Sequence, residues 1–395
     1  MVEVSPRLVF LIVFVSGLAA FLYWDRDNIE RHFILFYRRT ERGIDLIDRI
    51  AKRFPRFWNY YGWLGVATGL ASMVISFYLM AQVYGQMLVS RSVENGPSLV
   101  LPGLVSQNQF QAGVSFVPIE FWVIGVGIIM VVHEFSHGIV ARTEGFKINS
   151  VGWIVMGIFP GAFVEPEGER MLPAEGEQPG TGSEGGMWGL GDWKSRLKVL
   201  GAGSLANYIT AAVFFMAAVG VAGAITQPSQ VFYVADEGFP AAEAGMTNGT
   251  LHQINGKDIE GVGDVQNISE TIQVGDHVAI WTSEGNFTVT AVEKKGFDTG
   301  YIGIRVGQQR VIKDSYSDYS GGLQWFVSML QTIAFLNFVI GLFNMLPLKP
   351  LDGGLMADTL LGEYYPDKVK YLDRFSLFGW ALILSGILLG VIVGL

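Results

Sequence analysis

Two histidines that flank a glutamate, His133, Glu134 and His137, form the most chemically informative pattern in the sequence. On a helix, residues four positions apart lie about 40° apart around the axis, so both imidazoles point from one face toward one ion. Neutral imidazole suits Zn²⁺, and a catalytic zinc takes three protein ligands and leaves its fourth position to water. Glu134 is placed to take a proton from that water as a general base.

The alternative is a purely structural role, in which two buried histidines cap or bridge helices. The surrounding residues argue against it, because His133, Glu134 and His137 sit in the otherwise apolar stretch 121–141. Ionisable groups inside an apolar span cost several kcal/mol unless they have partners or a function. The chain has no cysteine, so a metal would be held by histidines and carboxylates. The pattern therefore predicts a metal site.

A third ligand must come from elsewhere in the chain. The remaining histidines are poorly placed, since His32 lies in a basic loop and His252 and His277 lie in a soluble stretch. Asp352 lies in a segment broken by Pro and Gly (residues 343–354) at the end of an apolar run, where irregular backbone can face a cavity. Taken alone, the Asp-Gly pair also fits a turn at a helix boundary.

These residues belong to a chain whose composition indicates a membrane protein. Hydrophobic residues make up 50% and charged residues 16%, whereas a soluble domain carries about 25% charge. Runs of roughly 20 apolar residues can cross a bilayer. Six runs qualify: 8–24, 63–89, 121–141, 199–225, 323–346 and 378–395. The first could also be a signal peptide, although its positive flank is weak and no small-residue cleavage site clearly follows.

Arginine and lysine in the connecting loops set the orientation. The loops after the first and third runs are rich in these residues, whereas the loop after the second run contains only Arg91. Both termini are therefore expected outside and these two basic loops inside. The third and fifth runs then both cross the membrane from the outside toward the cytoplasm. The histidine pair and Asp352 therefore fall at the same depth near the cytoplasmic side. This coincidence favours a shared metal.

Two inserts interrupt the apolar runs. Residues 151–164 are apolar but too short to span a membrane and contain Gly and Pro, so they predict a re-entrant or β-hairpin segment. A strand there could offer its backbone edge to a substrate, although a plain re-entrant loop is the alternative. Residues 230–313 form a soluble stretch with short β-type runs at 231–234, 277–281, 287–292 and 301–306.

The chain resembles the site-2 proteases, which are polytopic intramembrane metalloproteases. The resemblance rests on His133 to Gly138, on Asn344-Met345-Leu346-Pro347, on Leu351-Asp352-Gly353-Gly354 and on the insert. It implies that His133, His137 and Asp352 bind one catalytic Zn²⁺ and that Glu134 is the base. The insert is similar to a PDZ domain, and such domains take extended peptides by β-addition.

The resemblance also extends to a Gly-Pro-x-x-Asn pattern in the middle span of that family. This chain has Gly203-Ser204-Leu205-Ala206-Asn207, so Ser204 replaces the proline and Asn207 is kept. Asn207 and Asn344 are candidates for holding a substrate backbone or orienting the zinc site. Interhelical hydrogen bonding is an equally good interpretation of both.

We thus predict a mainly α-helical membrane protein with about six transmembrane helices, a short re-entrant or β-hairpin segment and an inserted small β-rich PDZ-like domain. Residues 1–60 hold the first span and a basic loop, 61–228 the first half of the membrane core, 229–314 the PDZ-like domain outside the cytoplasm, and 315–395 the second half. The expected location is the plasma membrane, with the active site near the cytoplasmic side.

The predicted activity is zinc-dependent hydrolysis of peptide bonds in transmembrane segments of membrane proteins. The partners are these substrates, the lipid bilayer and a peptide ligand of the PDZ-like domain, and the absence of a Lys/Arg block argues against nucleic acid. One competing function is a membrane-anchored zinc protease that cuts at the surface, but no later Glu rivals Asp352. Another is a PDZ-bearing scaffold or an ion transporter, which leaves Glu134 unexplained.

Overall fold

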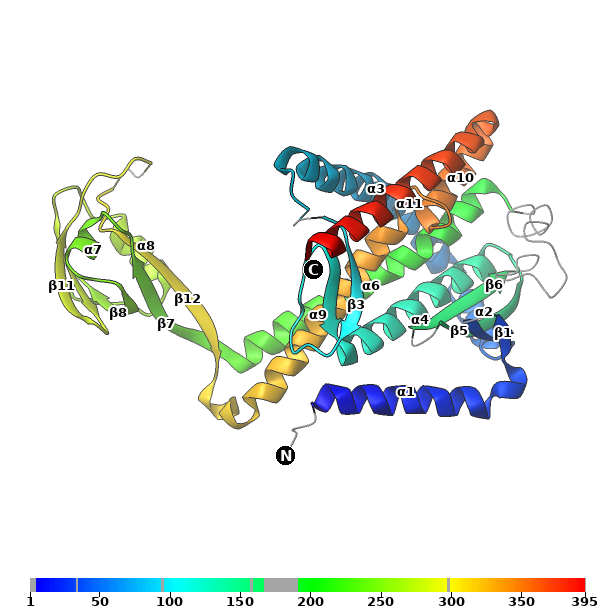
Figure 1. The fold of residues 1–395 in the computed structure, drawn as a ribbon, viewed down its shortest axis with the longest axis horizontal. Coiled ribbons are helices and arrows are strands. Elements are labelled where there is room, and N and C mark those ends of the chain that lie inside the picture. The colour runs from blue at the N-terminus through cyan, green and yellow to red at the C-terminus, as the bar shows by residue number, and fades with distance from the viewer. Residues whose placement is uncertain are drawn as a thin grey trace. The chain divides into compact units, whose positions relative to one another are not determined.

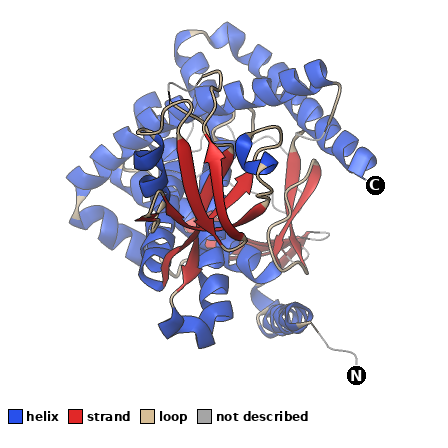
Figure 2. Cartoon of the chain, turned by 90° about the vertical axis from the view of Figure 1, so that its left-hand side faces the viewer, coloured by secondary structure: helices blue, strands red, loops and turns tan. Residues whose placement is uncertain are grey.

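The structure, a computed structural model, describes residues 5–32, 35–93, 96–156, 159–166, 191–296 and 299–394. The chain divides into two compact units. The first combines Met1–Ala218 with Ser328–Leu395, and the second is Val219–Val327. Helices form most of the first unit and strands dominate the second (Figure 1, Figure 2).

Six helices in the described part of the chain are long and apolar enough to cross a membrane, as predicted. They are α1 (Pro6–Trp24), α3 (Pro55–Ser90), α4 (Ile119–Thr143), α6 (Trp193–Ile225), α9 (Ser320–Asn344) and α11 (Val369–Gly394). Several of these helices are longer than the apolar runs predicted from the sequence. A charged residue ends an apolar run, but the helix continues through it. α3 thus begins before Arg56, and α11 begins before Arg374. The chain is a multi-pass membrane protein.

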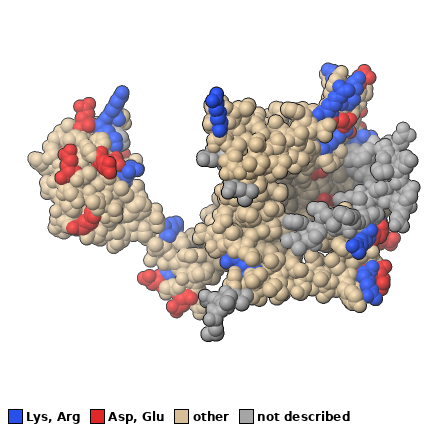
Figure 3. Space-filling model, in the orientation of Figure 1, with Lys and Arg blue, Asp and Glu red and all other residues tan. Residues whose placement is uncertain are grey.

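Charged side chains are distributed as a bilayer requires. On the visible face of the first unit they gather mainly at the end where α2 (Ile44–Arg53), β1 (Glu30–His32) and the start of α11 lie, and the flank is largely uncharged (Figure 3). Exposed apolar side chains such as Val74, Phe215 and Leu388 cover the helices instead. Apolar surface of this kind is stable in contact with lipid chains.

The predicted break in the apolar pattern at 151–164 is a β-hairpin. Strand β5 (Ile148–Met156) pairs antiparallel with β6 (Phe159–Pro166), and the two intervening residues lie outside the described part. β6 lies along α4 (Figure 1). The sequence did not predict that the basic loop adds β2 (Leu35–Thr40) and β1 to this sheet, whose order is β1-β2-β5-β6.

Polar contacts fasten this sheet and the neighbouring α2 helix at the predicted cytoplasmic side. Glu165 accepts hydrogen bonds from Arg39 Nε (2.8 Å) and from the Ser150 hydroxyl (2.6 Å), so β6 is tied to β2 and β5. On α2, Asp48 forms an ion pair with Arg142 at the end of α4. The hydrogen bond from Arg142 lowers the pKa of Asp48 below its usual value, so this link keeps its charge at neutral pH.

Helices α3 and α6 approach each other at glycines. A Cβ on Gly201 would lie 2.4 Å from the carbonyl carbon of Gly65, so only glycines permit this contact. Small residues at helix interfaces let membrane helices pack backbone to backbone. A short parallel pair, β3 (Ser98–Gly103) and β4 (Gly113–Pro118), packs on α11 and was not predicted.

The second unit is a small β domain with an antiparallel sheet in the order β11-β10-β8-β7-β12. Its strands are β7 (Thr226–Ala235), β8 (Asn248–Ile254), β9 (Lys257–Asp258), β10 (His277–Thr282), β11 (Gly285–Thr290) and β12 (Ile304–Ile312), with helices α7 (Pro240–Glu243) and α8 (Val262–Ser269). The core contains Val231, Tyr233 and Ile280. The run predicted at 301–306 becomes a strand only at Ile304, because Gly303 has a positive φ of 89° and interrupts the extended backbone.

Candidate metal centre

Helix α4 brings the two histidines together as their spacing predicts. The Nε2 atoms of His133 and His137 lie 3.0 Å apart. Both side chains face the interior of the unit, and His133 is only 7% exposed. Two imidazole nitrogens this close in an apolar bundle need a shared proton or a shared cation, since two free lone pairs would repel each other.

Asp352 completes the group, but in a different local setting from the one predicted. The broken segment is 345–351, and Asp352 is the first residue of helix α10 (Asp352–Tyr364). A carboxylate is stabilised in the first turn of a helix by the positive end of the dipole. Its Oδ2 atom lies 3.2 Å from His133 Nε2 and 3.4 Å from His137 Nε2.

The three ligand atoms fit a tetrahedral zinc. Zinc binds histidine nitrogen and carboxylate oxygen at about 2.0–2.2 Å, which places two tetrahedral ligands about 3.3–3.6 Å apart. The observed separations of 3.0, 3.2 and 3.4 Å are close to that value. Among the described residues, His133, His137 and Asp352 form a group of side chains close enough together to hold one metal ion. The donor set of two imidazoles and one carboxylate also leaves a fourth position open.

Helix α6 forms one wall of this site at a glycine. A Cβ on Gly203 would lie 2.3 Å from His137 Nε2 and 2.7 Å from His133 Cε1. No side chain other than hydrogen fits between α6 and the imidazoles. The position of Gly203 in the Gly-x-x-x-Asn pattern was visible in the sequence, but its contact with the histidines was not.

Each imidazole has a partner at its Nδ1 atom. His137 Nδ1 lies 2.7 Å from the carbonyl oxygen of Val199 on α6, which makes Nδ1 the protonated atom and leaves Nε2 free as a ligand. The sequence carried no signal for Val199, because its backbone makes the contact. The same part of α6 is held to the end of α4 by Lys198, whose ammonium donates to Glu144 at 2.8 Å.

Asn207 holds the other imidazole. Its amide nitrogen lies 3.1 Å from His133 Nδ1, and its buried oxygen has no hydrogen-bond partner among the described residues. A half-turn of the amide places the oxygen at Nδ1, where it accepts the N–H and leaves Nε2 to a metal. Asn344 behaves differently, because its amide nitrogen faces His133 Nε2 itself at 3.2 Å.

Glu134 is half-buried next to the first ligand, on the side of the β-hairpin. The backbone N–H of Val164 on β6 donates to its carboxylate. Successive N–H groups of a strand point to opposite edges, so the N–H of Ala162 points to the same side as that of Val164. The outer edge of β6 therefore runs past Glu134.

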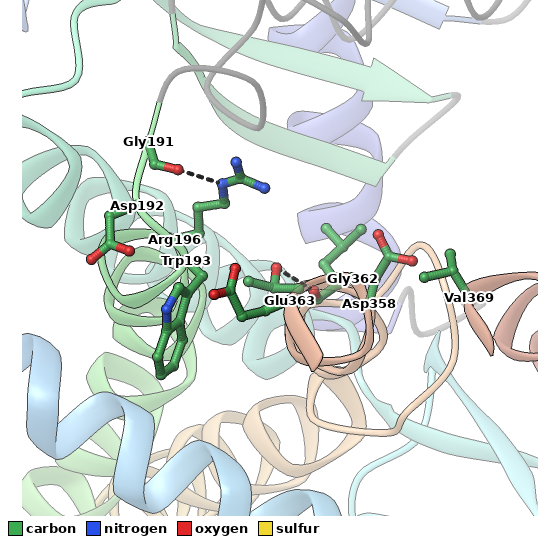
Figure 4. Close-up of a pocket in the computed structure, with 10 residues that line it drawn as sticks. Gly191, Asp192, Trp193, Arg196, Asp358, Gly362, Glu363 and Val369 are labelled. Atoms are coloured by element: carbon green, nitrogen blue, oxygen red, sulfur yellow. Dashed lines mark hydrogen bonds between the residues drawn. The ribbon is translucent and has the colours of Figure 1, made fainter. Parts of the chain in front are cut away.

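A polar pocket of about 700 Å³ opens between the start of α6 and α10 (Figure 4). Leu355, Thr359 and Gly362 line it and follow Asp352 at intervals of three, four and three residues, so they share its helix face. Asp192 and Arg196 line the opposite wall. The pocket thus lies along α10 beyond Asp352, and none of the three candidate ligands is among its lining residues.

Comparison with known proteins shows the family of the chain. Residues 121–386, more than half of the chain, match Peptidase family M50, and the chain therefore belongs to that family, which contains the site-2 proteases. It is a metalloendopeptidase. A protein of Methanocaldococcus jannaschii described as "Uncharacterized protein MJ0971" is 22% identical over 355 residues, covering 88% of this chain and 84% of the relative.

The close approach of α6 leads to a first prediction. Gly203→Ala places a methyl group against both imidazoles, so zinc affinity should fall by about 100-fold or more, the upper range for disturbed ligand geometry. Zinc content and affinity of the purified variant would be measured against Gly220→Ala, which lies on the same helix with nothing within 4 Å of its Cβ. Wild-type affinity in Gly203→Ala would contradict the geometry described here.

Proposed function

We propose that this metalloendopeptidase uses one zinc ion, held by His133, His137 and Asp352, to hydrolyse peptide bonds within transmembrane segments of other membrane proteins. The observation that carries the proposal is the triangle of ligand atoms with sides of 3.0, 3.2 and 3.4 Å. Two of these atoms come from α4, a helix that can cross a membrane, and the third comes from α10, which lies in the chain between two further helices of that kind. A site among such helices meets substrates that are themselves in the bilayer. We place it in the plasma membrane near the cytoplasmic side.

The chemistry divides between the ion and the chain. Bound zinc polarises a carbonyl and acidifies water. Glu134 takes the proton of the attacking water and delivers it to the leaving amine nitrogen, as a general base and then a general acid. Its hydrogen bond from Val164 holds the carboxylate beside His133. Val199 and Asn207 keep the imidazoles in the tautomer that presents Nε2.

The two asparagines have different roles in this proposal. Asn207 orients His133 through Nδ1. Asn344 faces the Nε2 lone pair that a metal would use, so with a metal held there its amide would be available to hold a substrate carbonyl. An amide donor aimed at developing charge lowers the barrier of acyl transfer.

Glu134→Gln tests the catalytic assignment. The amide cannot accept a proton from water, so cleavage of a transmembrane substrate should fall by about 10²–10⁴-fold, whereas zinc should stay bound because Glu134 is not a ligand. Metal analysis and a cleavage assay on the same preparation decide this, with Asp352→Ala as the variant that should lose zinc. Loss of zinc from Glu134→Gln would make Glu134 a ligand.

The substrate must be extended before its carbonyl reaches the site, and an unwound backbone in an apolar environment needs new hydrogen-bond partners. The outer edge of β6 can supply them by strand addition. It lies beside Glu134, and among the described residues no strand pairs with β6 on that side in the sheet order β1-β2-β5-β6. We assign the hairpin to substrate binding on these grounds.

A proline at Ala162 tests this assignment. Ala162→Pro removes an N–H from the outer edge and leaves the ladder to β5 in place, so cleavage should fall about tenfold, as for one lost hydrogen bond of about 1.4 kcal/mol. Zinc content should not change. The matched control is Ala162→Ser, which keeps the N–H. Equal cleavage by the proline and serine variants, in stable protein, would leave the hairpin as a plain loop.

We assign the second unit to peptide binding as a PDZ-like domain outside the cytoplasm. β12 is the last strand of the described sheet. Beside it lies a cavity of about 230 Å³, which is lined by apolar side chains such as Val265, Ile272 and Ile302. The edge of β12 can pair with the backbone of an extended peptide, and the neighbouring cavity can take one of its apolar side chains.

Deleting residues 230–313 and bridging the ends should therefore keep zinc bound and retain cleavage of a short transmembrane substrate. The physical reason is that the described ligands and their hydrogen-bond partners all lie in the first unit. Zinc content and turnover of the folded deletion would be compared with those of the full chain. Complete loss of turnover with zinc retained would mean that the unit takes part in catalysis.

A further inference from the structure

The loop 345–351 connects α9 to α10 and determines where Asp352 lies. It turns tightly, with the Leu348 N–H bonded to the Leu346 carbonyl at 2.7 Å and the Leu351 N–H bonded to the Leu348 carbonyl at 2.9 Å. Asp352 begins α10 directly after this turn. The position of its carboxylate therefore depends on the path of the loop.

One face of the last membrane helix binds a single residue of this loop. Asp373, Ser376 and Trp380 are spaced by three and four residues on α11 and share a face. The Lys349 N–H donates to Ser376 Oγ at 3.0 Å, and the Lys349 carbonyl accepts the indole N–H of Trp380 at 2.8 Å. The Lys349 ammonium donates to Asp373 at 3.0 Å. Every polar group of Lys349 is thus bonded to α11, and its ammonium also pairs with Asp358 of α10 at 2.5 Å.

Packing transmits this attachment to Asp352. Leu348 is fully buried, and a Cβ on Gly379 of α11 would lie 2.4 Å from Leu348 Cδ2. On the other side of the loop, a Cβ on Gly354 would lie 2.3 Å from the Leu348 carbonyl carbon. The loop is therefore in direct contact with α11 and with the first turn of α10, and it cannot shift without moving one of them.

We propose that Ser376 and Trp380 are positioning residues, which hold the loop 345–351 and through it place the Asp352 carboxylate where the third ligand is needed. The inference rests on the proposed zinc site. A zinc ligand must lie within about 0.2 Å of its ideal distance, and the two histidines on α4 cannot set the position of a carboxylate on a separate helix. The hydrogen bonds from α11 provide that constraint.

The test measures zinc affinity of the full-length protein in detergent by competition with a chelator, together with thermal unfolding of the metal-free protein. Trp380→Phe keeps an aromatic side chain, smaller than the indole, and removes the N–H, and Ser376→Ala removes the acceptor. The matched control is Trp122→Phe, which also removes an indole N–H bonded to a backbone carbonyl, that of Val100 at 3.4 Å. Both α11 variants should bind zinc about 10- to 100-fold more weakly, and the control should bind as the wild type does.

Asp352→Ala separates this inference from the proposed function. If Asp352→Ala binds zinc like the wild type, the proposed zinc site itself is wrong. If it weakens binding while Trp380→Phe and Ser376→Ala do not, the positioning role is overturned. Equal weakening by Trp380→Phe and Trp122→Phe also overturns it, because the effect is then one of general packing.

A double variant identifies the route of the effect. If Trp380 acts through Asp352, adding Trp380→Phe to Asp352→Ala should cause no further loss of zinc affinity, because the group being positioned is already absent. Fully additive losses would mean that Trp380 affects zinc by another path and would overturn the proposal.

Discussion

The structure depends on gathering two imidazoles and one carboxylate within a few ångströms inside an apolar bundle. These groups would otherwise be costly to bury, and a tetrahedral cation is the partner that suits all three atoms at once. The surrounding helices serve this constraint. α4 supplies the two imidazoles, α6 contacts both of them through Val199 and Asn207, and α10 begins at the carboxylate of Asp352.

Close approach of backbones makes this arrangement possible. At Gly65 and Gly201 the helices α3 and α6 touch, at Gly203 α6 touches the imidazoles, and at Gly353 and Gly354 α10 touches the preceding loop. In a membrane the association of helices relies on packing and hydrogen bonding, since lipid chains are as apolar as leucine. Glycine at these positions brings the polar atoms of different helices within bonding distance.

The sequence predicts the membrane spans and the histidine pair well. Apolar length identifies the six spans, and the i, i+4 spacing identifies the histidine pair, because both depend on local chain geometry. The loop between the second and third spans, which forms β3 and β4, and the pairing of β2 with β5 join segments without a periodic signal. The contacts of Val199 and Lys349 are made by backbone atoms, whose partners no residue type reveals. Asp352 was found through its context, whereas its place at the start of a helix required the fold.

Irregular backbone near the site is stable because its polar groups are bonded within the protein. The loop 345–351 bonds to itself and, through Lys349, to Ser376 and Trp380. The hairpin bonds through β5 to β2 on its inner side. The outer edge of β6 differs, since in the part of the chain that the structure describes its neighbour beside the site is the carboxylate of Glu134 and not another strand. An edge of this kind in apolar surroundings favours a chain that can complete it, and it lies next to Glu134, the general base of the proposed mechanism. In the proposed function, this edge serves both to hold an unwound substrate segment and to place the bond to be cut beside Glu134.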